Sequence, residues 1–143
     1  MVDETRFVIR FVDSWSIDEI VQLYKAGGWW KDSYDSSGIP GLIKGSYVFA
    51  VVVDSTNGTA IGMGRVLSDG VSDAYIQDVL ILSKYRRSGI GKKLVQSLID
   101  YCLSHGITWI GLMAEPGSEQ FYTASGFHVL KGYSPMRYHL TEE

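Results

Sequence analysis

The sequence is short of cysteine, proline and net charge, and each shortage excludes a class of protein. The single cysteine, Cys102, cannot form an intramolecular disulfide, so the fold does not depend on an oxidising compartment. With only three prolines and no Pro-rich linker in 143 residues, we expect a single domain over residues 1–143. The formal net charge is −3, and without a basic excess we expect no nucleic acid partner.

Long apolar runs and metal-ligand patterns are also missing. No apolar run approaches the roughly 18–20 residues that a membrane span needs, and residues 1–6 are charged, unlike a signal peptide. The three histidines, His105, His128 and His139, do not have the spacing of zinc ligands. We therefore expect a cytoplasmic protein with no membrane partner and no metal.

Hydrophobic periodicity predicts a mixed α/β domain. The expected strands cover residues 7–12, 47–54, 60–67, 74–82, 107–113, 127–130 and 136–140, and the expected helices cover 17–26, 39–44, 89–105 and 118–125. A meander of strands precedes a βαβ unit in this order, so both antiparallel and parallel pairing is expected.

The turn after the fourth expected strand is basic and contains two glycines. It opens a helix, whose first N–H groups have no intrahelical partner and carry partial positive charge, so an anion is favoured there. Gly89 and Gly91 have no side chain and let a phosphate approach the backbone closely. Arg86, Arg87 and Lys92 add formal positive charge. The sequence therefore predicts a phosphate-binding turn.

Two common nucleotide-binding patterns do not fit this turn. In a P-loop the two glycines stand five positions apart, whereas here they stand two apart. A dinucleotide-binding fingerprint needs glycine or alanine where this chain has Leu94.

The segment Arg86-Arg87-Ser88-Gly89-Ile90-Gly91 has the pattern Arg/Gln-x-x-Gly-x-Gly/Ala. It resembles the pyrophosphate loop of the GNAT superfamily of acetyl-CoA-dependent N-acetyltransferases. Residues 75–81 resemble the family's preceding strand, and residues 121–127 resemble its later Phe-Tyr-x-x-x-Gly-Phe motif. The resemblance covers residues 47–140, and the first 46 residues agree only in element order.

This resemblance implies a fold and an activity. The fold is a GNAT-like α/β domain, with a mixed, mainly antiparallel central sheet of about six or seven strands, a central parallel βαβ unit and about four helices. The activity is acetyl transfer from acetyl-CoA to a primary amine, first of all a small molecule, by direct attack through a tetrahedral intermediate. Acetylation of a protein lysine or N-terminus, and a non-catalytic acetyl-CoA sensor, stay open as alternatives, as does a homodimer.

The resemblance also assigns residues to the cofactor. Backbone groups of Val79, Leu80 and Ile81 would bind the pantetheine arm. The pyrophosphate would be bound at the turn by Arg86, Arg87, Ser88, Gly89, Ile90, Gly91 and Lys92. Family members often carry Asn and then Ala before the Phe-Tyr pair, and this chain has Glu115 and Ser118 there; Ser118 is the further cofactor contact.

Tyr122 matches the family tyrosine that protonates the departing thiolate. A phenol with a pKa of about 10 is protonated at neutral pH and can donate. Several family members carry Glu or His as the base where this chain has Tyr75 and Gln77. Asp78 is a carboxylate on the same strand, although simple alternation puts it on the opposite face unless a bulge re-aims it. A water relay in place of a single base stays open.

In this family the first helices and their loop build most of the acceptor pocket. That region carries Trp29, Trp30 and Tyr34, which could surround an apolar amine or contact an ammonium group through cation–π attraction. The alternative is that one tryptophan lies in the core and the others on a surface loop.

Overall fold

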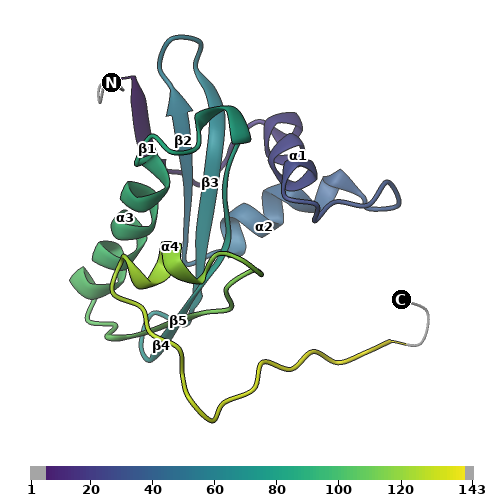
Figure 1. Ribbon diagram of the computed structural model, residues 1–143. Helices are drawn as coiled ribbons and strands as arrows, with labels where there is room; N and C mark the ends of the chain where they lie inside the picture. The colour runs from purple at the N-terminus through teal and green to yellow at the C-terminus, as the bar shows by residue number, and fades with distance from the viewer. Residues whose placement is uncertain (1–5, 141–143) are drawn as a thin grey trace. The chain divides into compact units, whose positions relative to one another are not determined.

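The structure is a computed structural model that describes residues 6–140 (Figure 1). Tertiary contacts divide the chain into a first unit, Met1–Leu112, and a second unit, Met113–Glu143, and each is described by itself. The elements in chain order are β1 (Phe7–Phe11), α1 (Ile17–Ala26), η1 (Ser36–Gly38), α2 (Ile39–Gly45), β2 (Val48–Asp54), β3 (Thr59–Ser68), β4 (Asp73–Ile81), η2 (Ser83–Tyr85), α3 (Ile90–Ser104), β5 (Trp109–Leu112) and α4 (Glu119–Thr123).

The first unit is built on a five-stranded sheet in the order β1-β2-β3-β4-β5. The pairs from β1 to β4 are antiparallel, and β4 pairs with β5 in parallel. Helix α3 makes the crossover that a parallel pair requires. The expected mixed α/β fold with a parallel βαβ unit is therefore confirmed.

Helices cover both faces of this sheet. Helices α1 and α2 lie on one face, where Ile20, Leu23 and Ile43 join a buried cluster with residues of β2 and β3. Helix α3 lies on the other face (Figure 1). A Cβ atom at Gly64 of β3 would stand 3.1 Å from Leu98 of that helix, so this glycine lets the helix approach the sheet.

The local elements follow their sequence signals closely. Helix α1 begins where Ser16 accepts a hydrogen bond from the Glu19 backbone, and it ends at Gly27. The short helix expected over 39–44 forms as α2, with proline in its first turn. The ends of the first five expected strands and of the long helix differ from the structure by no more than two residues.

The expected strands over 127–130 and 136–140 are wrong, because residues 127–140 contain no strand. The sheet consequently has five strands, not six or seven. The segment has the apolar residues of a strand, yet Val129, Met136 and Tyr138 are 60%, 87% and 84% exposed. Composition makes a segment able to form a strand, but a strand exists only where a partner edge supplies its hydrogen bonds.

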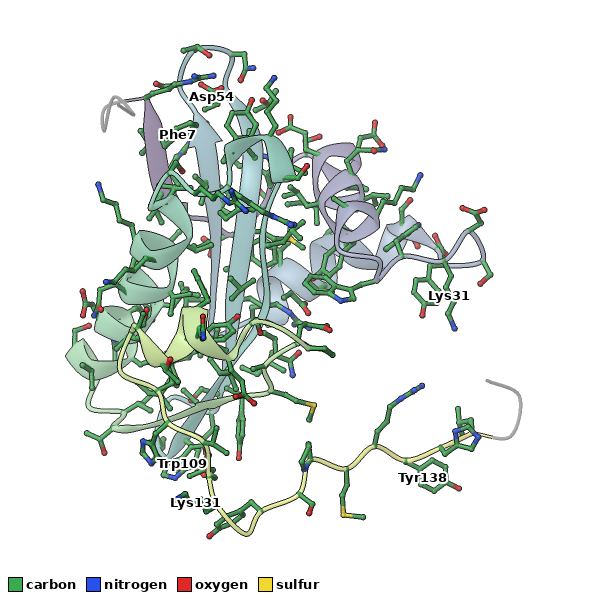
Figure 2. The ribbon with its side chains drawn as sticks, in the orientation of Figure 1. Phe7, Lys31, Asp54, Trp109, Lys131 and Tyr138 are labelled. Carbon is green, nitrogen blue, oxygen red and sulfur yellow. The ribbon has the colours of Figure 1, made fainter. Side chains whose placement is uncertain are left out.

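One carboxylate, Asp54 at the end of β2, is fully buried (Figure 2). Its oxygens accept hydrogen bonds from Arg6 Nη2 at 2.9 Å and from Thr56 Oγ1 at 2.7 Å. The Tyr85 hydroxyl approaches the same carboxylate at 3.4 Å. The Arg6 guanidinium and the Thr56 hydrogen bonds hold the pKa of Asp54 well below its usual range. Tyr85 is the last residue of η2. These bonds therefore connect the sheet to the start of the predicted phosphate-binding turn, residues 86–92, which is called the glycine turn below.

Replacing Asp54 with asparagine is expected to lower the melting temperature by about 5 °C or more. A carboxyl group whose pKa is lowered by folding stabilises the fold above the unfolded pKa of about 4, and that stability is lost as pH falls. The melting temperature of the Asp54→Asn variant should therefore fall less steeply than that of the wild type below pH 5. Thermal unfolding at several pH values tests this, with the exposed Asp13→Asn variant as control. Parallel pH curves for the wild type and Asp54→Asn would contradict it.

Candidate active site

The turn between η2 and α3 presents backbone N–H groups for which residues 6–112 supply no acceptor. The N–H of Arg86 donates to Ser83, and the next backbone-to-backbone bond comes from Lys93 to Gly89. In between, the Ile90 N–H has only the distant Ser88 hydroxyl, at 3.4 Å. The N–H groups without an acceptor in that range are those of Arg87, Ser88, Gly89, Gly91 and Lys92. This is the arrangement that binds a phosphate at a helix start.

Two residues of the turn have left-handed backbones, Gly89 with φ of 82° and Arg87 with φ of 65°. A Cβ at Gly89 would meet nothing within 4 Å, so the space beside its backbone is open. Arg86 Nε donates to the Ile81 carbonyl at 2.8 Å, and the Ser88 hydroxyl donates to the Tyr85 carbonyl at 2.7 Å. Both side chains therefore shape the turn, and Arg86 is partly engaged within it.

Strand β4 has an edge that no strand among residues 6–112 covers. The parallel register with β5 covers four pairs and ends at Ile76 opposite Leu112, whereas β4 continues to Ile81. On its other side β4 remains paired with β3, where Leu80 lies opposite Met63. The predicted pantetheine-binding residues Val79, Leu80 and Ile81 thus lie on a stretch whose outer backbone groups can receive an extended ligand.

A β-bulge interrupts β4 at Asp78. Arg65 of β3 lies opposite Gln77, and two residues earlier Met63 lies opposite Leu80, so β4 contains one extra residue. Asp78 has φ of 58°, a left-handed backbone that is uncommon for residues other than glycine. Simple alternation does not hold here, and the exception left open for a bulge applies: Asp78 lies on the same face as Gln77, because both contact Arg65 on the α1 face of the sheet.

The Asp78 carboxylate is held by residues from two other elements. Its Oδ2 atom accepts hydrogen bonds from the Tyr24 hydroxyl of α1 and from Arg65 Nε, both at 2.7 Å. Burial, followed by the nearby Asp78 charge, raises the pKa of Tyr24, so its hydroxyl remains a donor. Arg65 Nη2 also approaches Gln77 Oε1 at 3.4 Å. Of the three tentative base positions, the structure brings Gln77 and Asp78 together.

Tyr75, the third tentative base, lies against Trp109 of β5, with ring centroids 5.4 Å apart. It pairs with Gly111, where a Cβ would come within 2.6 Å of the Trp109 ring. Glycine at that position therefore leaves room for the tryptophan. The Tyr75 side chain is 47% exposed, and its ring contact is with β5, whereas the Asp78 carboxylate is bound from α1 and β3.

The predicted acceptor residues form an aromatic segment, defined here as Trp29, Trp30 and Tyr34. The rings of Trp30 and Tyr34 meet edge to face at 5.5 Å. Tyr24 lies 6.2 Å from Trp29 and 6.4 Å from Trp30. A Cβ at Gly27 would come within 2.7 Å of the Trp29 ring. The aromatic segment therefore connects through Tyr24 to the Asp78 carboxylate.

The second unit contains Tyr122, in the short helix α4. The Phe-Tyr-x-x-x-Gly-Phe motif forms a helix turn, where the Phe127 N–H donates back to the Tyr122 carbonyl at 3.2 Å. The rings of Phe121 and Phe127 pack at 4.9 and 5.9 Å from that of Tyr122. Burial, and then the charge of Glu115, raises the pKa of Tyr122. Its hydroxyl is therefore protonated at neutral pH and able to donate.

Ser118 lies immediately before α4 and bonds within its own turn. Its backbone N–H and its hydroxyl both donate to the Glu115 carbonyl, at 3.0 and 2.6 Å. These bonds fix the entry to the helix that carries Tyr122.

Sequence reasoning misses two members of the Asp78 network. It places Tyr24 only within the expected helix over 17–26, and Arg65 only within the expected strand over 60–67. Two signals point to them: a tyrosine on a buried stripe needs a partner for its hydroxyl, and an arginine within a buried strand needs a counterion.

Metal ligands do not gather anywhere in residues 6–140, since no three His, Cys, Asp or Glu side chains there form a group that could hold a metal ion. None of the helices in that range has the length and apolar character that crossing a membrane requires.

Two curated relatives show what the chain is similar to. The chain is 40% identical over 69 residues to GCN5-related N-acetyltransferase 2, chloroplastic, of Arabidopsis thaliana, a match to 48% of this chain and 27% of that protein. It is 29% identical over 136 residues to an uncharacterized N-acetyltransferase, ycf52, of Pyropia yezoensis, which covers 89% of this chain and 77% of the relative. The chain therefore spans about a quarter of the Arabidopsis protein and most of the Pyropia protein.

The fold has matches among solved structures. A GNAT family acetyltransferase from Streptococcus pneumoniae TIGR4 superposes with a TM-score of 0.77 at 22% identity, over 94% of this chain and 98% of that one. The family model of the acetyltransferase (GNAT) family matches residues 14–127. Because that match covers most of the chain and includes both the glycine turn and the Phe-Tyr-x-x-x-Gly-Phe motif, the protein belongs to the GNAT family of N-acetyltransferases.

Proposed function

We propose that this protein transfers an acetyl group from acetyl-CoA to a primary amine, with a small molecule as the first acceptor class. The observation that carries the proposal is the turn over residues 87–92 at the start of helix α3, where five of the six backbone N–H groups lack an acceptor among residues 6–112. Membership of the family implies the use of acetyl-CoA. We further propose one N-acetyltransferase domain over residues 1–143, supported by a family match that extends into both units.

The residues fit a pyrophosphate and an extended arm at adjacent places. Backbone groups of the turn, with Arg86, Arg87 and Lys92 nearby, would bind the diphosphate. The outer edge of β4 at Val79 to Ile81 would bind the amide-rich arm as an added strand. Ser118 would be a further contact. Bound acetyl-CoA would supply an acetyl group activated as a thioester.

Two proton transfers are then required of the chain. The acceptor amine must lose a proton before its nitrogen can attack, and Asp78 is the group we propose to take that proton. Gln77, which shares Arg65 with Asp78, and Tyr75, which lies against Trp109, are the proposed relay positions. When the carbon–sulfur bond breaks, the sulfur needs a proton, and the Tyr122 hydroxyl would supply it. As the amide forms, the nitrogen loses its second proton, which replaces the proton that Tyr122 donates to sulfur, and the proton on Asp78 passes to solvent. The sum is then an ammonium and acetyl-CoA converted into an amide, the CoA thiol and one released proton.

The aromatic segment supports an acceptor that is itself apolar or cationic. Trp30 and Tyr34 are partly exposed rings, 47% in the case of Tyr34, and rings of this kind attract ammonium groups. Acetylation of protein lysines is the competing function within the same chemistry. The cytoplasm remains our first proposal for its location, and the name of the Arabidopsis relative points to the chloroplast as the second.

Acetylation of amines should be measurable as CoA thiol release. We expect turnover with at least one member of a panel of aromatic amines, polyamines and lysine peptides, and none when acetyl-CoA is replaced by free acetate and ATP. Small amines should exceed peptides in kcat/KM. Better turnover of peptides would overturn the small-molecule assignment, and binding of acetyl-CoA with no turnover of any acceptor would favour a sensor.

A further inference from the structure

Asp78 occupies a backbone conformation that residues other than glycine adopt uncommonly. Its φ of 58° lies in the left-handed region, and the bulge turns it onto the same face as Gln77. Such a conformation persists only where surrounding contacts hold it. The contacts that hold this side chain are therefore part of how the site is built.

Those contacts all fall on one carboxylate oxygen. Tyr24 and Arg65 both donate to Oδ2, whereas Oδ1 accepts no hydrogen bond within residues 6–140. Among those residues only Ser125 has a side-chain polar atom that is both buried and without a partner. Because Oδ1 of Asp78 also has no partner, it must be accessible to solvent. The Asp78 side chain is 22% exposed. One of its oxygens is therefore fixed by hydrogen bonds, and the other is available to accept a proton or a hydrogen bond.

Tyr24 connects this carboxylate to the aromatic segment. It stands on α1, 54 residues before Asp78 in the chain, and its ring lies against both Trp29 and Trp30. Packing of the rings sets the direction of the hydroxyl, and the hydroxyl sets the position of Oδ2. The acceptor side of the first unit and the bulge of β4 are therefore linked through one side chain.

We propose that Tyr24 is a positioning residue, which holds Asp78 so that Oδ1 can take a proton from the acceptor amine. The inference rests on the proposed acetyl transfer. In the step concerned, an ammonium N–H bond breaks, a bond forms between that proton and Oδ1, and the neutral amine keeps the electron pair. Tyr24 takes no proton itself. Arg65 holds the same oxygen from β3, so the carboxylate is fixed from two sides.

The test is a double-mutant cycle of Tyr24→Phe and Asp78→Asn, because phenylalanine keeps the ring and removes only the hydroxyl. We expect Tyr24→Phe to lower kcat about tenfold, with the dissociation constant for acetyl-CoA unchanged because the glycine turn is not touched. In the Asp78→Asn background the same change should have almost no further effect on kcat. Tyr47→Phe, a change at a tyrosine beside Tyr101 on another part of the sheet, is the matched control.

Other outcomes separate this inference from the proposed function. Unchanged kcat in Tyr24→Phe, or an equal loss with and without the Asp78 carboxylate, would overturn the positioning role in an active enzyme. A wild type that binds acetyl-CoA but acetylates no amine would overturn both. Thermal unfolding of the four proteins shows that each folds, and independent effects of the two changes on the midpoint would contradict the hydrogen bond itself.

Discussion

Replacing Gly89 with glutamate is expected to weaken acetyl-CoA binding about 100-fold or more, a loss of about 2.7 kcal/mol. Three physical effects act in the same direction. The residue has φ of 82°, which an L side chain rarely adopts. The new side chain would enter the open space beside the backbone. Its carboxylate would repel the diphosphate at a helix start that otherwise favours anions. Calorimetric titration with acetyl-CoA measures the effect, and titration with ATP tests whether the turn also accepts a triphosphate.

The same helix supplies a matched control. Gly106 lies just beyond the other end of α3, with φ of 81°, and a Cβ there would meet nothing within 4 Å. Gly106→Glu therefore imposes the same side chain and the same backbone strain about 25 Å away along the helix. We expect it to bind acetyl-CoA like the wild type at some cost in stability. Equal losses of binding in the two variants would mean that the strain, and not the phosphate site, is responsible.

Features set by neighbouring residues could be predicted from the sequence. Helix α1 has its bounds because Ser16 and Gly27 supply local caps. The β2–β3 hairpin turns at Asn57-Gly58, where Gly58 has a positive φ of 74°. The glycine turn before α3 was also predictable, since an anion site at a helix start needs only a few consecutive residues.

Features set by pairing between distant segments could not be predicted. The bulge at Asp78 is a property of the register between β3 and β4, and strand alternation alone predicts the opposite face. The bond from Tyr24 to Asp78 joins residues 54 positions apart, and no local pattern specifies it. The prediction of a final strand pair fails for the same reason. The sequence of an apolar segment such as residues 127–130 does not determine which strand, if any, it pairs with.

Replacing Tyr122 with phenylalanine is expected to lower kcat about 100-fold or more, the usual contribution of a positioned general acid. The aromatic packing with Phe121 and Phe127 should survive, because only the hydroxyl is removed. Acetyl-CoA binding should stay at the wild-type level. Burial and the Glu115 charge raise the pKa of Tyr122, so the donor form persists to alkaline pH. Steady-state kinetics from pH 6 to pH 10 should therefore show no loss of wild-type kcat that comes from ionisation of this tyrosine.

Tyr133→Phe is the control for that loss, since Tyr133 is a tyrosine of the same unit that is 78% exposed and has no assigned role. A large loss of kcat in Tyr122→Phe alone, with acetyl-CoA binding retained, assigns the proton donation to Tyr122. Equal activity in Tyr122→Phe and the wild type would move that step to water or to another donor. Since removing a hydroxyl cannot alter the chemistry of a protein that performs none, a loss confined to Tyr122→Phe also distinguishes an enzyme from a sensor on the same fold.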